Sequence, residues 1–171
     1  MSSDQPAGHA IPTPTRGFLP SRIVSGGQTG VDRAGLEAAI AYDIEHGGWC
    51  PRGRLSEDGT IPSRYQLMEM DSPDYPARTE QNVIDSDATV ILHEGELKGG
   101  SLLTRRLAKR WKKPHLCLSL DQASPSELRQ WLVEVRPLVL NVAGPRDRSA
   151  PGIETRALDF LLRAFGGTAG K

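Results

Sequence analysis

The chain reads Ser25-Gly26-Gly27-Gln28-Thr29-Gly30-Val31-Asp32-Arg33 at the point where a short apolar run gives way to an alanine-rich pattern of helical period. The apolar run covers residues 22–24, and the helical pattern continues to Tyr42. Backbone N–H groups at the start of a helix point outward, and the helix dipole adds partial positive charge there. A strand, a glycine-rich turn and a helix N-terminus in this order predict an anion cradle, which we expect to bind a phosphorylated small molecule.

Two well-known phosphate motifs are excluded at this turn. No Gly-Lys-Ser/Thr closes it, as a P-loop requires, and its glycine spacing is G-G-x-x-G rather than G-x-G-x-x-G. One alternative is a strand-to-helix turn that needs glycine only for its geometry. The hydrogen-bonding side chains of Gln28, Thr29 and Asp32 at the same rim favour a ligand site, because glycines let the backbone approach a phosphate closely.

The composition restricts the class of protein. The 171 residues suit a single domain, and 21 Lys and Arg balance 21 Asp and Glu, so the net charge is zero. This balance argues against a dedicated nucleic-acid or membrane-surface protein, which is usually basic. Cys50 and Cys117 cannot build a disulfide framework. No apolar run approaches the ~20 residues that cross a bilayer, and no signal-peptide pattern opens the chain, so we expect a cytoplasmic protein.

The chain divides into a tail and one domain. Residues 1–20 are rich in Pro, Ser, Gly and Ala and have little to bury, which predicts a disordered tail. Residues 21–171 alternate strand and helix patterns and are expected to form a Rossmann-like ligand-binding domain. Strands are expected at 22–25, 65–69, 88–93, 115–120 and 138–142, with a further short strand around 47–50.

The strand and helix patterns together predict the fold class. The runs 89–92 and 138–142 are almost continuously apolar, as in strands that a parallel sheet buries on both faces. The segments between strands are amphipathic, and one of them opens with the capping box Ser124-Pro125-Ser126-Glu127. We therefore expect an α/β fold with a single doubly wound, mainly parallel sheet and helices on both faces.

Ligands of such folds bind beyond the carboxyl ends of the strands, so loops that follow strands are candidate binding loops. In the loop after residues 47–50, Arg52 and Arg54 would clamp a phosphate, and Glu57 and Asp58 would hold a hydroxyl or a metal. The alternative is a surface loop of balanced charge. His46 and Cys50 have a loose metal-like spacing, but no second His or Cys pair accompanies them, so we expect no protein-built metal site.

A second glycine-rich turn follows the most apolar strand. Gly99 and Gly100 precede a helical pattern, where Ser101 would donate to a phosphate and Thr104 would face it one turn later. Two such turns at two strand ends are more specific than either alone. The cationic residues at 105–113 resemble a nucleic-acid patch, but they fit better as the polar face and C-terminal end of this helix.

Three more side chains lie on segments expected near the binding edge. Arg78 and Asn82 are four residues apart and would share one helix face, although a helix capped by Thr79 with exposed charges explains them equally well. Arg146 follows the last expected strand and is a further candidate anion contact, or part of a solvated loop.

The order of these motifs resembles the molybdenum carrier family, whose members are related to molybdenum-cofactor carrier proteins. The resemblance covers residues 22–165. It is carried by residues 25–33, Gly48-Trp49-Cys50-Pro51-Arg52-Gly53-Arg54, Glu57-Asp58-Gly59, Ile61-Pro62, Tyr65, Arg78-Thr79-Glu80, Asn82-Val83, Asp85-Ser86-Asp87-Ala88, Gly99-Gly100-Ser101 and Asn141-Val142-Ala143-Gly144-Pro145-Arg146.

The resemblance implies a Rossmann-like fold of the Lonely Guy superfamily and a homo-oligomer, either dimeric or tetrameric. It implies binding of the molybdenum cofactor, a pterin with a terminal phosphate and a dithiolene-held oxo-molybdenum, and molybdoenzymes as acceptors. The dithiolene would hold the metal, so the protein needs no metal ligands. The residues expected to contact this ligand are Gly26, Gly27, Gln28, Thr29, Gly30, Asp32, Arg52, Arg78, Asn82, Gly99, Gly100, Ser101, Thr104 and Arg146.

The resemblance leaves other functions open. Lonely Guy phosphoribohydrolases cleave the base from a nucleoside 5′-monophosphate and carry P-G-G-x-G-T-x-x-E with a catalytic Glu, which corresponds to Thr104 here. A neutral Thr supplies neither a general base nor charge, so a non-catalytic carrier is the leading hypothesis. A hydrolase that uses Asp32, Glu57, Asp58 or Glu96 instead, or a nucleotide-sensing module, are the alternatives.

Overall fold

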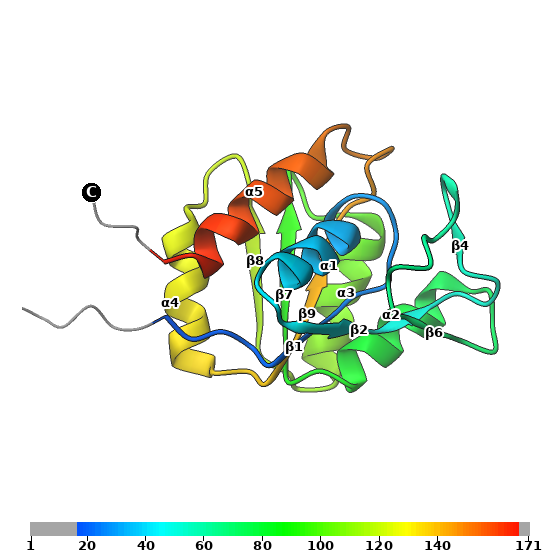
Figure 1. Ribbon diagram of the computed structural model, residues 1–171, viewed down its shortest axis with the longest axis horizontal. Coiled ribbons are helices and arrows are strands. Elements are labelled where there is room, and N and C mark those ends of the chain that lie inside the picture. Colours follow the sequence, from blue (N-terminus) through cyan, green and yellow to red (C-terminus); the bar gives the residue numbers. More distant parts are fainter. Residues whose placement is uncertain (1–16, 168–171) are drawn as a thin grey trace, which may run out of the picture.

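A five-stranded parallel sheet forms the centre of the protein. The computed structural model describes residues 17–167, and Figure 1 shows its helices around this sheet. The strands are β1 (Arg22–Val24), β2 (Glu45–Gly47), β7 (Ala88–His93), β8 (His115–Ser119) and β9 (Val139–Ala143). Their order is β2-β1-β9-β7-β8, and every neighbouring pair is parallel. The predicted α/β class with a mainly parallel sheet is confirmed.

Helices cover both faces of the sheet (Figure 1). They are α1 (Val31–Ala41), α2 (Tyr75–Ile84), α3 (Gly99–Arg110), α4 (Pro125–Val135) and α5 (Ile153–Phe165). Helices α1, α4 and α5 share one hydrophobic cluster with the sheet, whereas α2 and α3 pack together on the other side. The capping box predicted at the start of α4 is present, and the Ser124 N–H donates to a Glu127 carboxylate oxygen at 2.6 Å.

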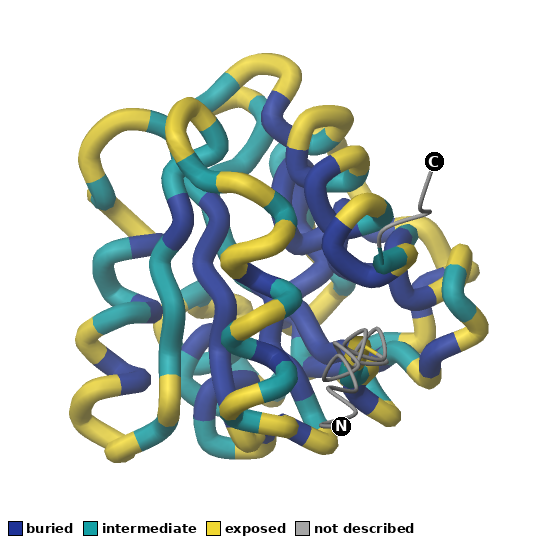
Figure 2. The backbone as a smooth tube through the Cα atoms, turned by 90° about the vertical axis from the view of Figure 1, so that its left-hand side faces the viewer, coloured by how far each residue is buried: buried dark blue, intermediate teal, exposed yellow. Residues whose placement is uncertain are grey.

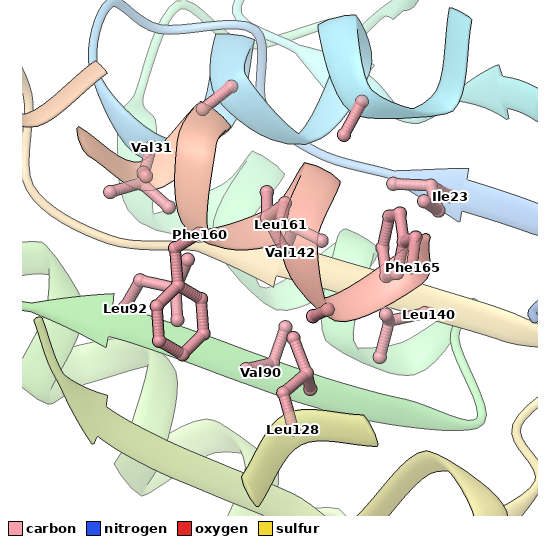
Figure 3. Packing of buried hydrophobic residues seen from close by; sticks show 14 of the residues in the cluster. Ile23, Val31, Val90, Leu92, Leu128, Leu140, Val142, Phe160, Leu161 and Phe165 are labelled. Carbon is pink, nitrogen blue, oxygen red and sulfur yellow. The ribbon is translucent and has the colours of Figure 1, made fainter. Parts of the chain in front are cut away.

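The main core lies between the sheet and the α1, α4 and α5 layer. Val90, Leu92 and Leu140 of the central strands belong to one buried cluster with Leu128 of α4 and with Phe160 and Phe165 of α5 (Figure 3). The period-two alternation of a strand places these side chains on one face. In Figure 2 the central strands are almost entirely buried, whereas the edge strand β8 is mostly intermediate in burial.

The position of β9 determines where the loops meet. The last strand of the chain lies between β1 and β7, with Leu140 in register with both Ile23 and Ala88. Buried polar side chains fix this register as well, because Asn141 on β9 donates to the Thr89 hydroxyl on β7 at 3.2 Å. Since all three strands are parallel, their following loops meet at one edge of the sheet.

The expected strands at 65–69 and 47–50 differ from the observed ones. Only Met68–Glu69 is extended, and it forms β6, which pairs with β3 (Trp49–Cys50) outside the central sheet. The Arg54 guanidinium donates to the carbonyls of Ile61, Pro62 and Tyr65, which fixes the intervening chain as a loop. The stretch at 47–50 divides between β2 and β3 at Gly48.

A small hairpin, β4 (Leu55–Ser56) and β5 (Gly59–Thr60), stands apart from the sheet. We refer to residues 55–60 as the hairpin. The tail is expected at residues 1–20, of which residues 1–16 lie outside the part of the chain that the structure describes. Within the described part, Phe18 packs against the main core, and the Arg136 guanidinium lies 4.6 Å from its ring centre.

We predict that Leu140→Ala lowers the free energy of unfolding by about 2–5 kcal/mol, because it leaves a cavity at a fully buried position in the central strand. Leu138→Ala is the matched control, since Leu138 is 62% exposed. Urea unfolding followed by circular dichroism measures both. Equal losses for the two variants would contradict the assignment of Leu140 to the core.

Candidate functional site

A cavity of about 900 Å³ opens at the edge where the loops after β1, β7 and β9 meet. Its walls come from the first turn of α1, the start of α2, the β7–α3 segment and the β9–α5 loop. The polar and charged lining residues are Gln28, Asp32, Tyr75, Arg78, Thr79, His93, Glu94, Glu96, Lys98, Ser101, Thr104, Arg146 and Ser149.

The N-terminus of α3 is open toward this cavity. Gly99 and Gly100 line it, and a Cβ placed on either residue would meet no atom within 4 Å. Within residues 17–167, no side chain caps this helix. Exposed N–H groups and the positive end of the helix dipole favour an anion at this position. The second glycine-rich turn therefore has the geometry of an anion cradle.

The first glycine-rich turn binds the chain's own groups instead. The Gly30 N–H donates to a Glu154 carboxylate oxygen at 3.0 Å, and the Gln28 N–H donates to Asp32 Oδ2 at 3.3 Å. Gly30 has φ +85°, and a Cβ there would lie 2.3 Å from the Pro145 carbonyl oxygen. Glycine is required here for a left-handed backbone and a close approach to the β9–α5 loop. Two internal carboxylates thus accept from the turn that the sequence predicts as an anion cradle.

Two arginines lie on the α1 and α2 side of the cavity. Arg78 Nη1 is 3.3 Å from Asp32 Oδ2, and both side chains are largely buried. The Arg146 guanidinium lies 4.1 Å from the centre of the Tyr75 ring, and that of Arg78 lies 5.8 Å from it. Burial, opposed mainly by Arg78, raises the pKa of the Asp32 carboxyl. The tyrosine ring and the carboxylate hold two cations beside the cavity.

The other predicted site residues occupy several positions. Ser101 and Thr104 line the cavity, but the Thr104 hydroxyl donates to the Gly100 carbonyl at 2.8 Å. Asn82 lies outside the lining and holds β3, because its side chain bonds both the N–H and the carbonyl of Trp49. The exposed Arg52 also lies outside the lining.

The remaining polar side chains of the first turn bind the hairpin. Gln28 Nε2 donates to the Leu55 carbonyl at 2.8 Å, and the Thr29 hydroxyl donates to Glu57. Arg33 forms a two-point ion pair with Asp58, with N–O distances of 2.6 and 2.9 Å. These side chains explain much of the polarity of the turn without a ligand.

Glu57 links three segments. Its carboxylate accepts from the Thr29 hydroxyl and from the Arg148 N–H at 3.1 Å, and so joins the hairpin to the loop that carries Arg146. Burial alone raises the pKa of Glu57, but these hydrogen bonds outweigh it and lower the pKa below its usual value. The Arg33 guanidinium and the Ser56 hydroxyl likewise hold the pKa of Asp58 well below its usual range.

Sequence reasoning missed three residues of the site. Tyr75 and Lys98 line the cavity, and Glu154 accepts from the first turn. Lys98 directly precedes Gly99 of the second glycine-rich turn, and Tyr75 lies three residues before Arg78, so their closeness to expected site residues is a usable signal. Nothing in the sequence indicates that Glu154 reaches across 124 positions to Gly30.

Two negative findings concern the described part of the chain. Residues 17–167 contain no cluster of three His, Cys, Asp or Glu side chains arranged to hold a metal ion. No helix among them is long and apolar enough to cross a membrane.

Burial raises the pKa of both the Cys50 and Cys117 thiols, which disfavours the reactive thiolate.

A parallel sheet with helices on both faces places the protein in the Rossmann-like class of α/β folds, and the cavity lies at the carboxyl ends of the strands, where proteins of this class bind their ligands. Residues 23–165 match the family model described as the circularly permutated YpsA SLOG family, and the chain belongs to this family. The crystal structure of the "Putative molybdenum carrier protein" from Syntrophus aciditrophicus SB is similar, with 46% sequence identity and a TM-score of 0.83. The match covers 87% of this chain and 96% of that chain. The comparison with curated proteins gives no match.

The ion pair of the hairpin predicts an acid-sensitive contact. A carboxyl whose pKa is lowered on folding stabilises the protein above its unfolded value, about 4, and loses this effect as the pH falls through the folded value. We therefore expect Asp58→Asn to reduce the drop in Tm between pH 6 and pH 3, because the depressed carboxyl is gone.

Asp43→Asn is the matched control, since Asp43 is an exposed carboxylate outside the hairpin. Thermal unfolding at each pH by calorimetry gives the comparison. An unchanged acid response in Asp58→Asn would show that the Arg33–Asp58 pair does not contribute to the acid sensitivity.

Proposed function

We propose that the protein binds the molybdenum cofactor, or a closely similar phosphorylated pterin, and carries it as cargo without chemical conversion. One observation carries the proposal, namely the open N-terminus of α3, which lines the same cavity as Arg78 and Arg146. A relative that is 46% identical over most of this chain bears the name of a molybdenum carrier, which supports the same ligand class.

The cargo suits the cavity in size and charge. Small-molecule pockets commonly measure about 300–1,000 Å³, and this cavity of about 900 Å³ lies within that range. The cofactor is anionic at its phosphate and at its oxo-molybdenum end. The N–H groups of Gly99, Gly100 and Ser101 would hold the phosphate, while the guanidinium groups of Arg78 and Arg146 would pair with negative oxygens.

The proposal extends to the protein's partners. A carrier must release its cargo, so molybdoenzymes are the expected acceptors in the cytoplasm. A dimer or tetramer of this chain would present several equivalent sites. Because the dithiolene of the pterin ligates the metal, the protein contributes hydrogen bonds and charge rather than metal ligands.

The matched pair Gly100→Asp and Gly100→Ala tests the carrier function. Both substitutions have room, because a Cβ at Gly100 meets no atom within 4 Å. Aspartate would place a negative charge at the helix N-terminus and compete with the anionic cargo, whereas alanine adds only a methyl group. We expect stoichiometric molybdenum and oxidised pterin in the wild-type protein and in Gly100→Ala, and at least a tenfold loss in Gly100→Asp.

The proteins should be purified from a host that synthesises the molybdenum cofactor, with molybdenum measured by mass spectrometry and pterin by fluorescence. Circular dichroism shows whether Gly100→Asp keeps the fold. A wild-type protein without either component, or equal loading of all three proteins, would reject the proposal.

A second candidate function rests on Asp32. A buried carboxylate with a raised pKa beside a cavity is a feature of general acids and bases, and a hydrolase of nucleoside 5′-monophosphates needs such a group. Glu96 also lines the cavity, but it is exposed. Glu57 and Asp58 are engaged by the first turn and lie outside the lining.

The hydrolase function predicts release of free base from a nucleoside 5′-monophosphate, with loss of at least 100-fold in Asp32→Asn, following the usual size of an acid–base contribution. Chromatographic detection of the base measures it. Binding of the nucleotide without base release would favour the sensing module. If the protein neither binds nor hydrolyses the nucleotide, both of these alternatives are rejected and the carrier function remains.

A further inference from the structure

The geometry points to a second role for the first glycine-rich turn: it is a socket for the Arg78 guanidinium, and Gly26 and Asp32 are positioning residues that act on a bound anion through Arg78. This inference rests on the proposed function only in that the cavity binds an anion. It assigns the two glycine-rich turns different tasks, since one receives the anion and the other holds a cation beside it.

The first argument is steric. An ideal Cβ on Gly26 would lie 1.7 Å from Nη1, 2.4 Å from Cζ and 2.9 Å from Nε of Arg78. These are the three nearest atoms, so the space that a side chain would fill is the space that the guanidinium occupies. Gly26 is not among the glycines with positive φ, so its backbone does not demand glycine. The missing side chain at this position is therefore explained by Arg78.

The second argument is electrostatic. Asp32, in the first turn of α1, places Oδ2 at 3.3 Å from Arg78 Nη1, and the same oxygen accepts from the Gln28 N–H. Asp32 is 5% exposed and Arg78 12% exposed in their side chains. A buried cation needs a counter-charge, and this carboxylate supplies it from the same turn that leaves room for the guanidinium.

The third argument concerns the remaining surroundings of Arg78. The Tyr75 ring lies one turn earlier on α2, with its centre 5.8 Å from the Arg78 guanidinium carbon. Arg78 Nε is buried and has no hydrogen-bond partner among residues 17–167. The guanidinium is thus bounded by Gly26, Asp32 and Tyr75 while its donors are incompletely used.

A fixed arginine binds an anion better than a free one. Ordering a long side chain on binding costs about 0.5–1.5 kcal/mol, and a guanidinium that is already held avoids much of this cost. Its planar fork also pairs with two oxygens only in a defined orientation. Adding a methyl group at Gly26 should displace the flexible end of Arg78 and weaken anion binding, although no atom of the new side chain touches the anion.

A double-mutant cycle separates this role from direct contact. Inorganic phosphate is the probe, titrated into the full chain while the amide signals of Gly100 and Ser101 are followed by NMR. We expect Arg78→Ala to weaken phosphate binding about tenfold, as for loss of one charge-assisted hydrogen bond. Gly26→Ala should cause a similar loss alone and no further loss in the Arg78→Ala background.

The Arg78 Nε–H signal, assigned by its disappearance in Arg78→Ala, gives a readout that general destabilisation does not mimic. It should shift in Gly26→Ala and stay in place in Gly17→Ala, where the added Cβ has only an ordinary contact at 3.9 Å. Gly17→Ala should also bind phosphate as the wild-type protein does.

Several results would overturn the inference. Losses that multiply in the double variant would show that Gly26 acts on the anion independently of Arg78. An unshifted Arg78 Nε–H signal in Gly26→Ala, or a wild-type protein without phosphate binding, would have the same effect. Molybdenum loading decides the carrier function separately, because a protein that binds phosphate with the expected cycle but carries no molybdenum would retain the socket and lose the cargo assignment.

Discussion

The pairing of β9 between β1 and β7 is the constraint on which the site depends. The last strand of the chain enters the middle of the sheet, and parallel hydrogen bonding on both sides fixes its direction and register. Three loops from distant parts of the sequence therefore end at one edge. The Val31 N–H donates to the Pro145 carbonyl at 3.2 Å, which ties the loop after β9 to the start of α1.

Around this edge the protein arranges opposite charges on separate elements. Two carboxylates, Asp32 and Glu154, accept from N–H groups of the turn that leads into α1, so negative charge already lies at that helix N-terminus. The start of α3 carries no acidic residue in its first turn and remains open. Glycines thus precede both helices, but internal acceptors occupy the N-terminus of α1 while the N-terminus of α3 stays open. The difference lies in the side chains that tertiary folding brings to each.

The sequence allowed the fold class and the outline of the cavity to be predicted, since continuous apolar strands and amphipathic helices are local signals. Gly100, Ser101 and Arg146 were selected by their place after strands, and the structure brings them to one cavity. The partners of the first turn could not be predicted, because Glu154 and Pro145 reach it from the far end of the chain. The strand expected at 65–69 is wrong for residues 65–67, because the Arg54 guanidinium holds the Tyr65 carbonyl and no periodicity records such a contact.

The contacts of the hairpin also bear on the dynamics of the protein. Its residues are exposed or intermediate in burial, and the contacts described for it are mainly polar, from Gln28, Thr29 and Arg33. Segments with few buried apolar contacts open more often than the core around them. Opening of the hairpin would free the Arg148 N–H from Glu57 and loosen the loop that bears Arg146. The residence time of a bound anion would then depend on a segment that does not line the cavity.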